Sequence, residues 1–254
     1  MRIGMTKYTI NKAFEKNFPY PIWKIEMDCE HSMLALECRQ IDNTFPVVYV
    51  LDFNGNTLLN EYNLDAKEWT LESIQGDYLI FKKFGSYSPI QSGIKVIHIP
   101  SKTQCFEYME YVIKEVYQGV IQAFHRSIPS GIYFYIDIMT GDISNTSNSN
   151  LQYPHRDINY PIPYQRNLPT FMRDINYIDQ IWLQPYNDLF LWSYHSKSEH
   201  QYHLNLTLSS KNEVFDSKII LNGIDKLIPQ PYFTVKDKIF FLSGNKMNIS
   251  AYLV

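Results

Sequence analysis

Apolar and polar positions follow each other along most of the chain in short runs that are separated by turn residues, which is the pattern of β-strands. The stretch 69–109 shows this pattern most clearly. Its expected strands are 69–74, 78–84, 93–99 and 104–109, with the tight turn Gln75-Gly76-Asp77 and a polar loop through Pro89 between them. We predict that this stretch forms an antiparallel four-stranded meander, the unit of a β-propeller blade.

The same unit recurs along the chain. Expected first strands begin at Trp23, Trp69, Val112, Trp182 and near Asp225, in steps of about 43–46 residues with one longer step of about 70. Expected second strands are nearly continuous apolar runs, as in strands that are covered on both faces. The second strands are 33–38, 78–81, 119–124, 189–192 and 238–242, and the third strands are 47–51, 94–99, 132–136, 202–206 and 249–254. We therefore predict an all-β fold, a five-bladed β-propeller of four-stranded antiparallel blades in a single domain over residues 1–254.

Two segments depart from the repeat. The last unit stops at its third strand, so we predict that the N-terminal stretch 3–10 pairs beside the C-terminal strand and closes the last blade, because an open position would leave a bare sheet edge. A disordered terminus is the alternative. Residues 144–166 form an insertion, first rich in Ser and Asn and then in Pro and Tyr. It reads either as a flexible or packed cover or as a binding loop.

Composition and charge narrow the partners and the compartment. The net charge is −3 without any basic block, which argues against nucleic acid, and no apolar run is long enough for a membrane span. The N-terminus lacks an apolar leader, so we expect a cytoplasmic protein. Cys29, Cys38 and Cys105 are too scattered for a disulfide framework or a zinc cluster. We assign no catalytic residue or cofactor, because the common nucleotide, hydrolase and zinc motifs are missing.

Glu26, Glu72 and Glu115 each lie three residues after the start of an expected first strand. First strands line the central channel of a propeller, so these carboxylates could converge there. Together they could bind a hard cation or perform acid–base chemistry. They could equally be polar residues that pair with Lys24 or Lys114. Strand alternation leaves open which face points to the channel.

Other side chains give further candidates. Trp23, Trp69 and Trp182 open three first strands and serve either for packing between blades or as a stacking platform for sugars. His195 and His200 flank the expected turn 197–199 and are weak candidates for a transition-metal site, against a simple solvated hairpin. Glu37 and Arg39 share one strand face and are expected to form either a structural ion pair that is shared with the next blade or a ligand clamp.

Several short stretches resemble known families. Residues 34–39, 50–58, 68–71 and 92–96 look like an uncharacterised bacterial family that is known only as a domain of unknown function and has propeller-like repeats. This resemblance covers mainly the first half of the chain and implies no activity. The turns after Leu51 and Ile136 resemble quinoprotein-like propeller hairpins, although the docking tryptophan of those repeats is missing.

These observations favour a cytosolic binding or interaction scaffold that holds a small polar ligand or cation at the channel mouth, or that binds another protein. The alternative is a carbohydrate-acting hydrolase or lyase that uses channel carboxylates. We expect neither nucleic acid nor membrane as a partner.

Overall fold

The computed structural model describes residues 8–84, 93–128, 131–147 and 150–254. Within these ranges the chain is all-β, with 22 strands and one short 3-10 helix, Thr170–Met172. No helix in the described part of the chain has the length and apolar character that are needed to cross a membrane. The polar loop predicted around Pro89 lies outside the described residues.

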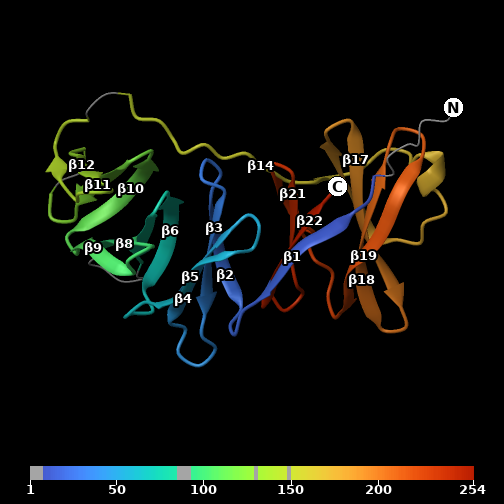
Figure 1. Cartoon of the computed structure of the whole chain (residues 1–254), viewed down its shortest axis with the longest axis horizontal. Coiled ribbons are helices and arrows are strands. Elements are labelled where there is room, and N and C mark those ends of the chain that lie inside the picture. Colours follow the sequence, from blue (N-terminus) through green and yellow to red (C-terminus); the bar gives the residue numbers. More distant parts are fainter. Residues whose placement is uncertain (1–7, 85–92, 129–130, 148–149) are drawn as a thin grey trace. The chain divides into compact units, whose positions relative to one another are not determined.

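The strands form five separate antiparallel sheets (Figure 1). Sheet 1 contains β2 (Ile22–Asp28), β3 (Met33–Arg39), β4 (Pro46–Asp52) and β5 (Thr57–Asn63). Sheet 2 contains β6 (Trp69–Gln75), β7 (Tyr78–Lys83), β8 (Ile94–His98) and β9 (Thr103–Tyr108). Sheet 3 contains β10 (Tyr111–Tyr117), β11 (Val120–His125), β12 (Phe134–Asp137) and β13 (Ile143–Ser144). All three are meanders of four strands in sequence order, as predicted.

The other two sheets have five strands each, which departs from the predicted four. Sheet 4 contains β15 (Ile162–Pro163), β16 (Ile178–Tyr186), β17 (Leu189–Ser198), β18 (Gln201–Ser209) and β19 (Val214–Ile224). Sheet 5 contains β14 (Ile158–Asn159), β20 (Phe233–Val235), β21 (Lys238–Leu242), β22 (Asn248–Leu253) and β1 (Asn11–Asn17). The extra strand in each sheet is a two-residue piece of the insertion.

The chain divides into two compact units. The three-sheet unit is Phe18–Arg156 and holds sheets 1, 2 and 3. The two-sheet unit combines the described residues up to Asn17 with Asp157–Val254 and holds sheets 4 and 5.

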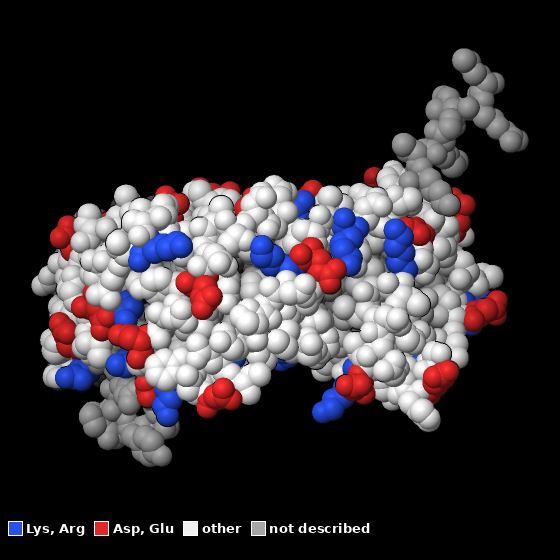
Figure 2. Space-filling model, turned by 60° about the horizontal axis from the view of Figure 1, so that its bottom comes forward, with Lys and Arg blue, Asp and Glu red and all other residues white. Residues whose placement is uncertain are grey.

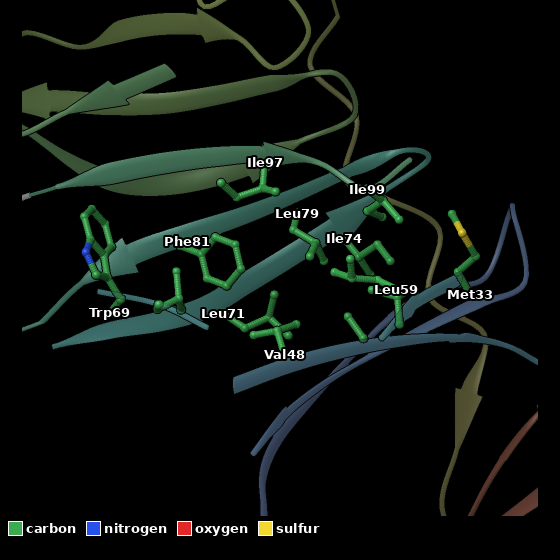
Figure 3. Packing of buried hydrophobic residues seen from close by; sticks show 13 residues of the cluster. Met33, Val48, Leu59, Trp69, Leu71, Ile74, Leu79, Phe81, Ile97 and Ile99 are labelled. Atoms are coloured by element: carbon green, nitrogen blue, oxygen red, sulfur yellow. The ribbon is translucent and has the colours of Figure 1, made fainter. Parts of the chain in front are cut away.

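Successive sheets of the three-sheet unit pack face to face. Sheets 1 and 2 share a buried cluster in which Val48 and Leu59 of sheet 1 meet Leu71 and Phe81 of sheet 2 (Figure 3). Sheets 2 and 3 share a second cluster, which joins Ile80, Ile94 and Val96 to Ile121 and Ile136. Each fully buried side chain of this size contributes about 1.5–3 kcal/mol to folding, so the stacking of sheets is the main source of stability.

The two-sheet unit is built in the same way. Leu191, Leu204 and Leu206 of sheet 4 pack against Ile239 and Phe241 of sheet 5 in one buried cluster. The second strands are apolar on both faces, as their continuous apolar runs predict, because they are central strands of stacked sheets.

Two turns after third strands each begin with an aspartate whose carboxylate accepts backbone N–H groups of the turn. The Asp52 carboxylate accepts backbone N–H bonds from Asn54 and Asn56, both at 2.8 Å, and the Asp137 carboxylate accepts those of Met139 and Thr140. The glycine of the second turn, Gly141, has φ +80°, and an added Cβ would lie 2.8 Å from the Phe106 ring. These two turns are the hairpins that the sequence singles out.

The N-terminal segment pairs with the C-terminal strand, but further along the chain than predicted. The pairing strand is β1, Asn11–Asn17, which lies antiparallel to β22 from Asn11↔Leu253 to Asn17↔Asn248. Of the predicted stretch 3–10, only residues 8–10 belong to the described residues, and they lie outside a strand. Ile10 is fully buried and donates its N–H to Asp216.

The first strand of sheet 5 also lies later than predicted. The region near Asp225 is not a strand, because β19 runs to Ile224 and the chain then passes through Pro229 and Pro231. Proline has no N–H for a sheet ladder, so the strand begins only at Phe233, in β20.

Candidate functional site

The three glutamates of the predicted ring lie on the first strands of sheets 1, 2 and 3, in β2, β6 and β10. Each of these strands carries a β-bulge, but at different positions in the repeat. The unpaired residues in the ladders are Trp23, Glu72 and Lys114. A bulge re-aims the side chains around it, so aligned positions of the three strands are not strictly equivalent.

The structure brings Glu26 and Glu72 together around one ammonium group. The Nζ atom of Lys24 lies 3.2 Å from Glu26 Oε1 and 3.4 Å from Glu72 Oε2. Lys24 also donates to the backbone oxygen of Leu71 at 2.7 Å, and Lys82 lies 2.7 Å from Glu72. The two carboxylates are thus bridged by Lys24, which is one of the pairings that the sequence left open.

An arginine of the insertion completes this group. Arg156 Nη2 lies 3.6 Å from Glu26 Oε2. Arg156 and Glu72 also line a cavity of about 470 Å³ together with Glu115 and Lys114. All three predicted glutamates therefore belong to one charged region of the three-sheet unit, which we call the glutamate–lysine site (Glu26, Glu72, Glu115, Lys24, Lys82, Lys114 and Arg156).

Glu26 is the most perturbed carboxyl group of this site. Burial raises the pKa of Glu26 above its ordinary value, and the nearby charge of Glu72 adds to this, while Lys24 and Arg156 oppose it. Its side chain is 15% exposed. A carboxyl group with a raised pKa beside a second carboxylate can take up or release a proton, and the surrounding cations can hold a negatively charged group.

The insertion contacts the three-sheet unit along the ends of its first strands. The N–H of Gln118 donates to the backbone oxygen of Gln152 at 2.8 Å, and the rings of Tyr117 and Tyr153 lie 4.9 Å apart. Pro154 lines the cavity of the glutamate–lysine site. This part of the insertion therefore contacts the strand ends and lines the site, and its role as a binding loop stays a prediction. Residues 148–149 lie outside the described residues.

Side-chain hydrogen bonds hold the first strands of neighbouring sheets in place. Asp28, at the end of β2, accepts the N–H of Gly76 in sheet 2 at 2.7 Å. Gln75, at the end of β6, accepts the N–H of Gly119 in sheet 3 at 2.8 Å. Burial opposes ionisation of Asp28, but hydrogen bonds from Gly76 and His31 outweigh it and lower the pKa of Asp28. The repeated bond fixes the spacing of the strands that carry the glutamates.

The pair Glu37–Arg39 has a structural position. Glu37 is fully buried and forms an ion pair with Arg39. Its other oxygen accepts bonds from Thr70 Oγ1 at 2.9 Å and from Leu71 N at 2.6 Å. The pair therefore joins sheet 1 to the first strand of sheet 2, as expected for an ion pair that is shared with the next sheet.

Trp23 and Trp69 lie in contrasting environments. Trp69 is 1% exposed in the core between sheets 1 and 2, and the ammonium groups of Lys83 and Lys95 lie 5.3 and 4.7 Å from its ring centre. Trp23 is 70% exposed. Its ring is therefore the one of the two that is open to a ligand, and Trp69 serves packing.

The histidines of the predicted hairpin do not converge. The β17–β18 hairpin turns at 199–200 rather than 197–199, so His195 lies opposite Leu204. His195 is 3% exposed, and its Nε2 accepts the N–H of Ile228 at 3.2 Å. His200 is exposed. Among the described residues, no group of three or more His, Cys, Asp or Glu is placed to hold a metal ion.

Sequence reasoning missed Lys82 and Arg156. Lys82 lies in an apolar second strand, and Arg156 follows Tyr153-Pro154-His155 in a segment without a repeat partner. The only sequence signal for Arg156 is its place in the insertion, which breaks the blade period.

Comparisons with known proteins identify no family. No protein-family model matches the chain, and no curated protein matches it, so the resemblance to the bacterial family stays a prediction. Among solved structures, the chain is similar to the β-propeller domain of the Trilobed protease from Pyrococcus furiosus, with 12% identity, coverage of 89% of this chain and 78% of that chain, and a TM-score of 0.33. It is also similar to an acylaminoacyl peptidase from Pyrococcus horikoshii, with 9% identity, 87% and 35% coverage, and a TM-score of 0.31.

A third likeness is to Raptor from Chaetomium thermophilum, with 8% identity, 96% and 28% coverage, and a TM-score of 0.33. This chain thus spans about a third of the length of the peptidase and less of Raptor. At these TM-scores and identities we draw no inference from the likenesses.

Proposed function

We propose that the protein is a cytosolic binding or interaction scaffold, built as one five-bladed β-propeller domain, that holds a small polar ligand at the glutamate–lysine site. The observation that carries this proposal is that Glu72, Glu115 and Arg156 of the insertion line one cavity, and that Arg156 and Lys24 connect Glu26 to it.

The propeller arrangement is supported by features of each unit. The chain forms five antiparallel sheets, and the first three repeat the same meander. Within each unit, successive sheets pack face to face through apolar clusters. The strand β1 pairs with β22, which is how a propeller joins its two ends.

The charges of the site suggest the kind of ligand. Glu26 and Glu72 are already paired with Lys24, and Arg156 contacts Glu26, so a bare cation must displace these groups. A polar ligand that carries both an ammonium and a carboxylate group can instead pair with both, its ammonium with the glutamates and its carboxylate with Lys24 and Arg156. On the face shown in Figure 2, Lys and Arg are interspersed with Asp and Glu, which agrees with the proposal that nucleic acid is not a partner.

The test is a thermal-shift screen with zwitterionic amino acids, sugars, calcium and transition metals, on the wild type and on Glu72→Gln. A ligand at about 100 times its Kd stabilises by about 2.7 kcal/mol, which corresponds to a shift of about 5–10 °C in Tm. We expect Glu72→Gln to lose most of this shift, and the exposed Glu61→Gln on β5 to retain it. A ligand that raises the Tm of Glu72→Gln as much as the Tm of the wild type would have to bind at another site.

One observation favours the alternative, a carbohydrate-acting hydrolase or lyase. Glu26 has a raised pKa, as an acid catalyst needs, and Glu72 lies beside it on the shared ammonium of Lys24. Release of reducing sugar from a polysaccharide panel by the wild type, and its loss in Glu26→Gln, would favour this activity over a scaffold.

A further inference from the structure

One face of sheet 4 carries a hollow of about 240 Å³ that is ringed by aromatic side chains. Side chains alternate along β17, so Leu191 points to the core shared with sheet 5, while Phe190 and Trp192 point to the opposite face. On that face the segment after β15 supplies two more rings, Tyr164 and Phe171. The hollow lies entirely within the two-sheet unit.

The rings are arranged around Trp192. Tyr164 lies edge-to-face on Trp192 with ring centres 5.1 Å apart, and Phe171 does so at 6.4 Å. Phe190 is tilted, with its ring centre 6.5 Å away. The indole N–H of Trp192 donates to Ser209 Oγ at 2.9 Å, so the polar atom of this ring is satisfied. Trp192 itself is only 3% exposed, so the aromatic surface that remains for a ligand belongs to Tyr164, Phe171 and Phe190, and it suits another flat apolar group.

The aromatic lining differs from the rings in the core. Tyr232 and Phe241, in the cluster between sheets 4 and 5, are buried to 2% exposure or less, whereas Tyr164, Phe171 and Phe190 are only half-buried. A ligand that covers these partly exposed ring faces would therefore gain hydrophobic free energy, because folding leaves part of their area in contact with water.

The mouth of the hollow carries a single charge. Lys211 is exposed and lines the hollow, which has no acidic residue among its lining residues. Among the described residues, no carboxylate lies within ion-pair distance of Lys211. Ser210, beside it, is engaged in its own turn, where its hydroxyl accepts the N–H groups of Asn212 and Glu213. The ammonium group of Lys211 is thus available to an anion at the edge of an aromatic pocket.

We propose that this hollow is a second binding site, which takes a small aromatic carboxylate with its ring against Tyr164, Phe171 and Phe190 and its carboxylate on Lys211. The site is independent of the glutamate–lysine site, because it lies in the other unit and shares no residue with it. The proposal of this second site does not depend on whether the protein acts as the scaffold proposed above.

Titration of the full-length protein with phenylacetate, followed by saturation-transfer difference NMR, tests this site. A ligand of this size is expected to bind with Kd on the order of 1 mM. Acetate lacks the ring and phenethylamine carries the opposite charge, so we expect no measurable binding of acetate and binding of phenethylamine that is at least about threefold weaker.

Matched variants assign the binding to the hollow. Lys211→Gln should weaken phenylacetate binding about threefold and remove the preference over phenethylamine, since an exposed ion pair is worth up to about 1 kcal/mol. Phe190→Leu should weaken both ligands, while Lys226→Gln, another exposed lysine of this unit, should change neither. Circular dichroism establishes that each variant is folded. If Phe190→Leu does not fold, the comparison of the wild type with Lys211→Gln still tests the site.

Two outcomes would overturn the proposal. One is the absence of saturation transfer to phenylacetate at up to 5 mM (about five times the expected Kd), and the other is equal phenylacetate affinity in the wild type and Lys211→Gln.

Discussion

His195 is a titratable residue that is buried in the two-sheet unit and that the proposed sites do not use. Burial lowers the pKa of His195 below its ordinary value of 6.5, while the charge of Asp179 opposes this. As pH falls through 6.5, the unfolded chain takes up a proton that the folded protein does not. The stability contribution of a neutral His195 is therefore complete above pH 6.5 and is lost as the pH falls from there through the folded pKa.

We expect the wild type to lose up to about 1.4 kcal/mol of unfolding free energy per pH unit in this range through His195. His195→Gln retains an oxygen that can accept the N–H of Ile228, but it does not titrate. Urea denaturation at pH 7.5, 6.5 and 5.5 should give a flatter pH profile for His195→Gln than for the wild type. The exposed His200→Gln should keep the wild-type slope, and an unchanged slope in His195→Gln would show that burial does not control this histidine.

At the residue scale, the position of a side chain within a strand can be predicted from the sequence better than its exposure to solvent. Trp23 and Trp69 align at the start of their strands, yet one is exposed and the other is in the core. The cause is the bulge at Trp23, which leaves this residue unpaired in β2. A bulge depends on the fit between two strands and leaves no clear mark in one of them, so the face of Trp23 could not be predicted. The three glutamates could be predicted as candidate site residues because each is a polar residue at the same position of an otherwise apolar repeat.

Strand β1 shows how one element can join distant parts of the chain. It pairs with β22, its Phe14 ring contacts Phe240, and Ile10 just before it is buried in the core of the two-sheet unit. Lys218 donates to the backbone oxygen of Ile10, so the segment also contacts sheet 4. Loss of this segment would expose the edge of β22 and leave a cavity at Ile10.

A chain that begins at Phe18 should therefore unfold at a lower urea concentration, because the cavity at Ile10 alone costs about 2–5 kcal/mol. A synthetic peptide of residues 8–17 should raise the midpoint again in a concentration-dependent way, since it binds only the folded unit. A scrambled peptide of the same composition is the control. Equal midpoints for the full and shortened chains would mean that β1 is not needed for the stability of sheet 5.

The predicted elements were right where sequence alternation and burial agree. The second strands β3, β7 and β21 were found within a residue or two, because central strands need continuous apolar runs, whereas β17 and β18 are longer than predicted. The first strand of sheet 5 was missed because β20 has only three residues and follows a Pro-containing loop. The two-residue strands β14 and β15 could not be predicted either, since their pairing comes from the edges of β20 and β16 rather than from their own sequence.

At the scale of the whole molecule, the repeat period is the main argument for a propeller. The five sheets occur in two compact units, with three four-stranded meanders in one and two five-stranded sheets in the other. The chain passes between the units twice, once after Asn17 and once after Arg156. The pairing of β1 with β22 joins the N-terminal and C-terminal strands within the two-sheet unit.

A closed five-bladed domain has a definite size in solution. A compact chain of 254 residues has an expected radius of gyration of about 18 Å. For the single propeller proposed above, small-angle X-ray scattering of the monomer should give this value and a pair-distance distribution with a single maximum, because all five sheets would surround one axis. Two units joined only by their two connections would give a larger radius and a shoulder at long distances. Such a profile would contradict the single propeller, and it would leave the glutamate–lysine site intact because all its residues lie within the three-sheet unit.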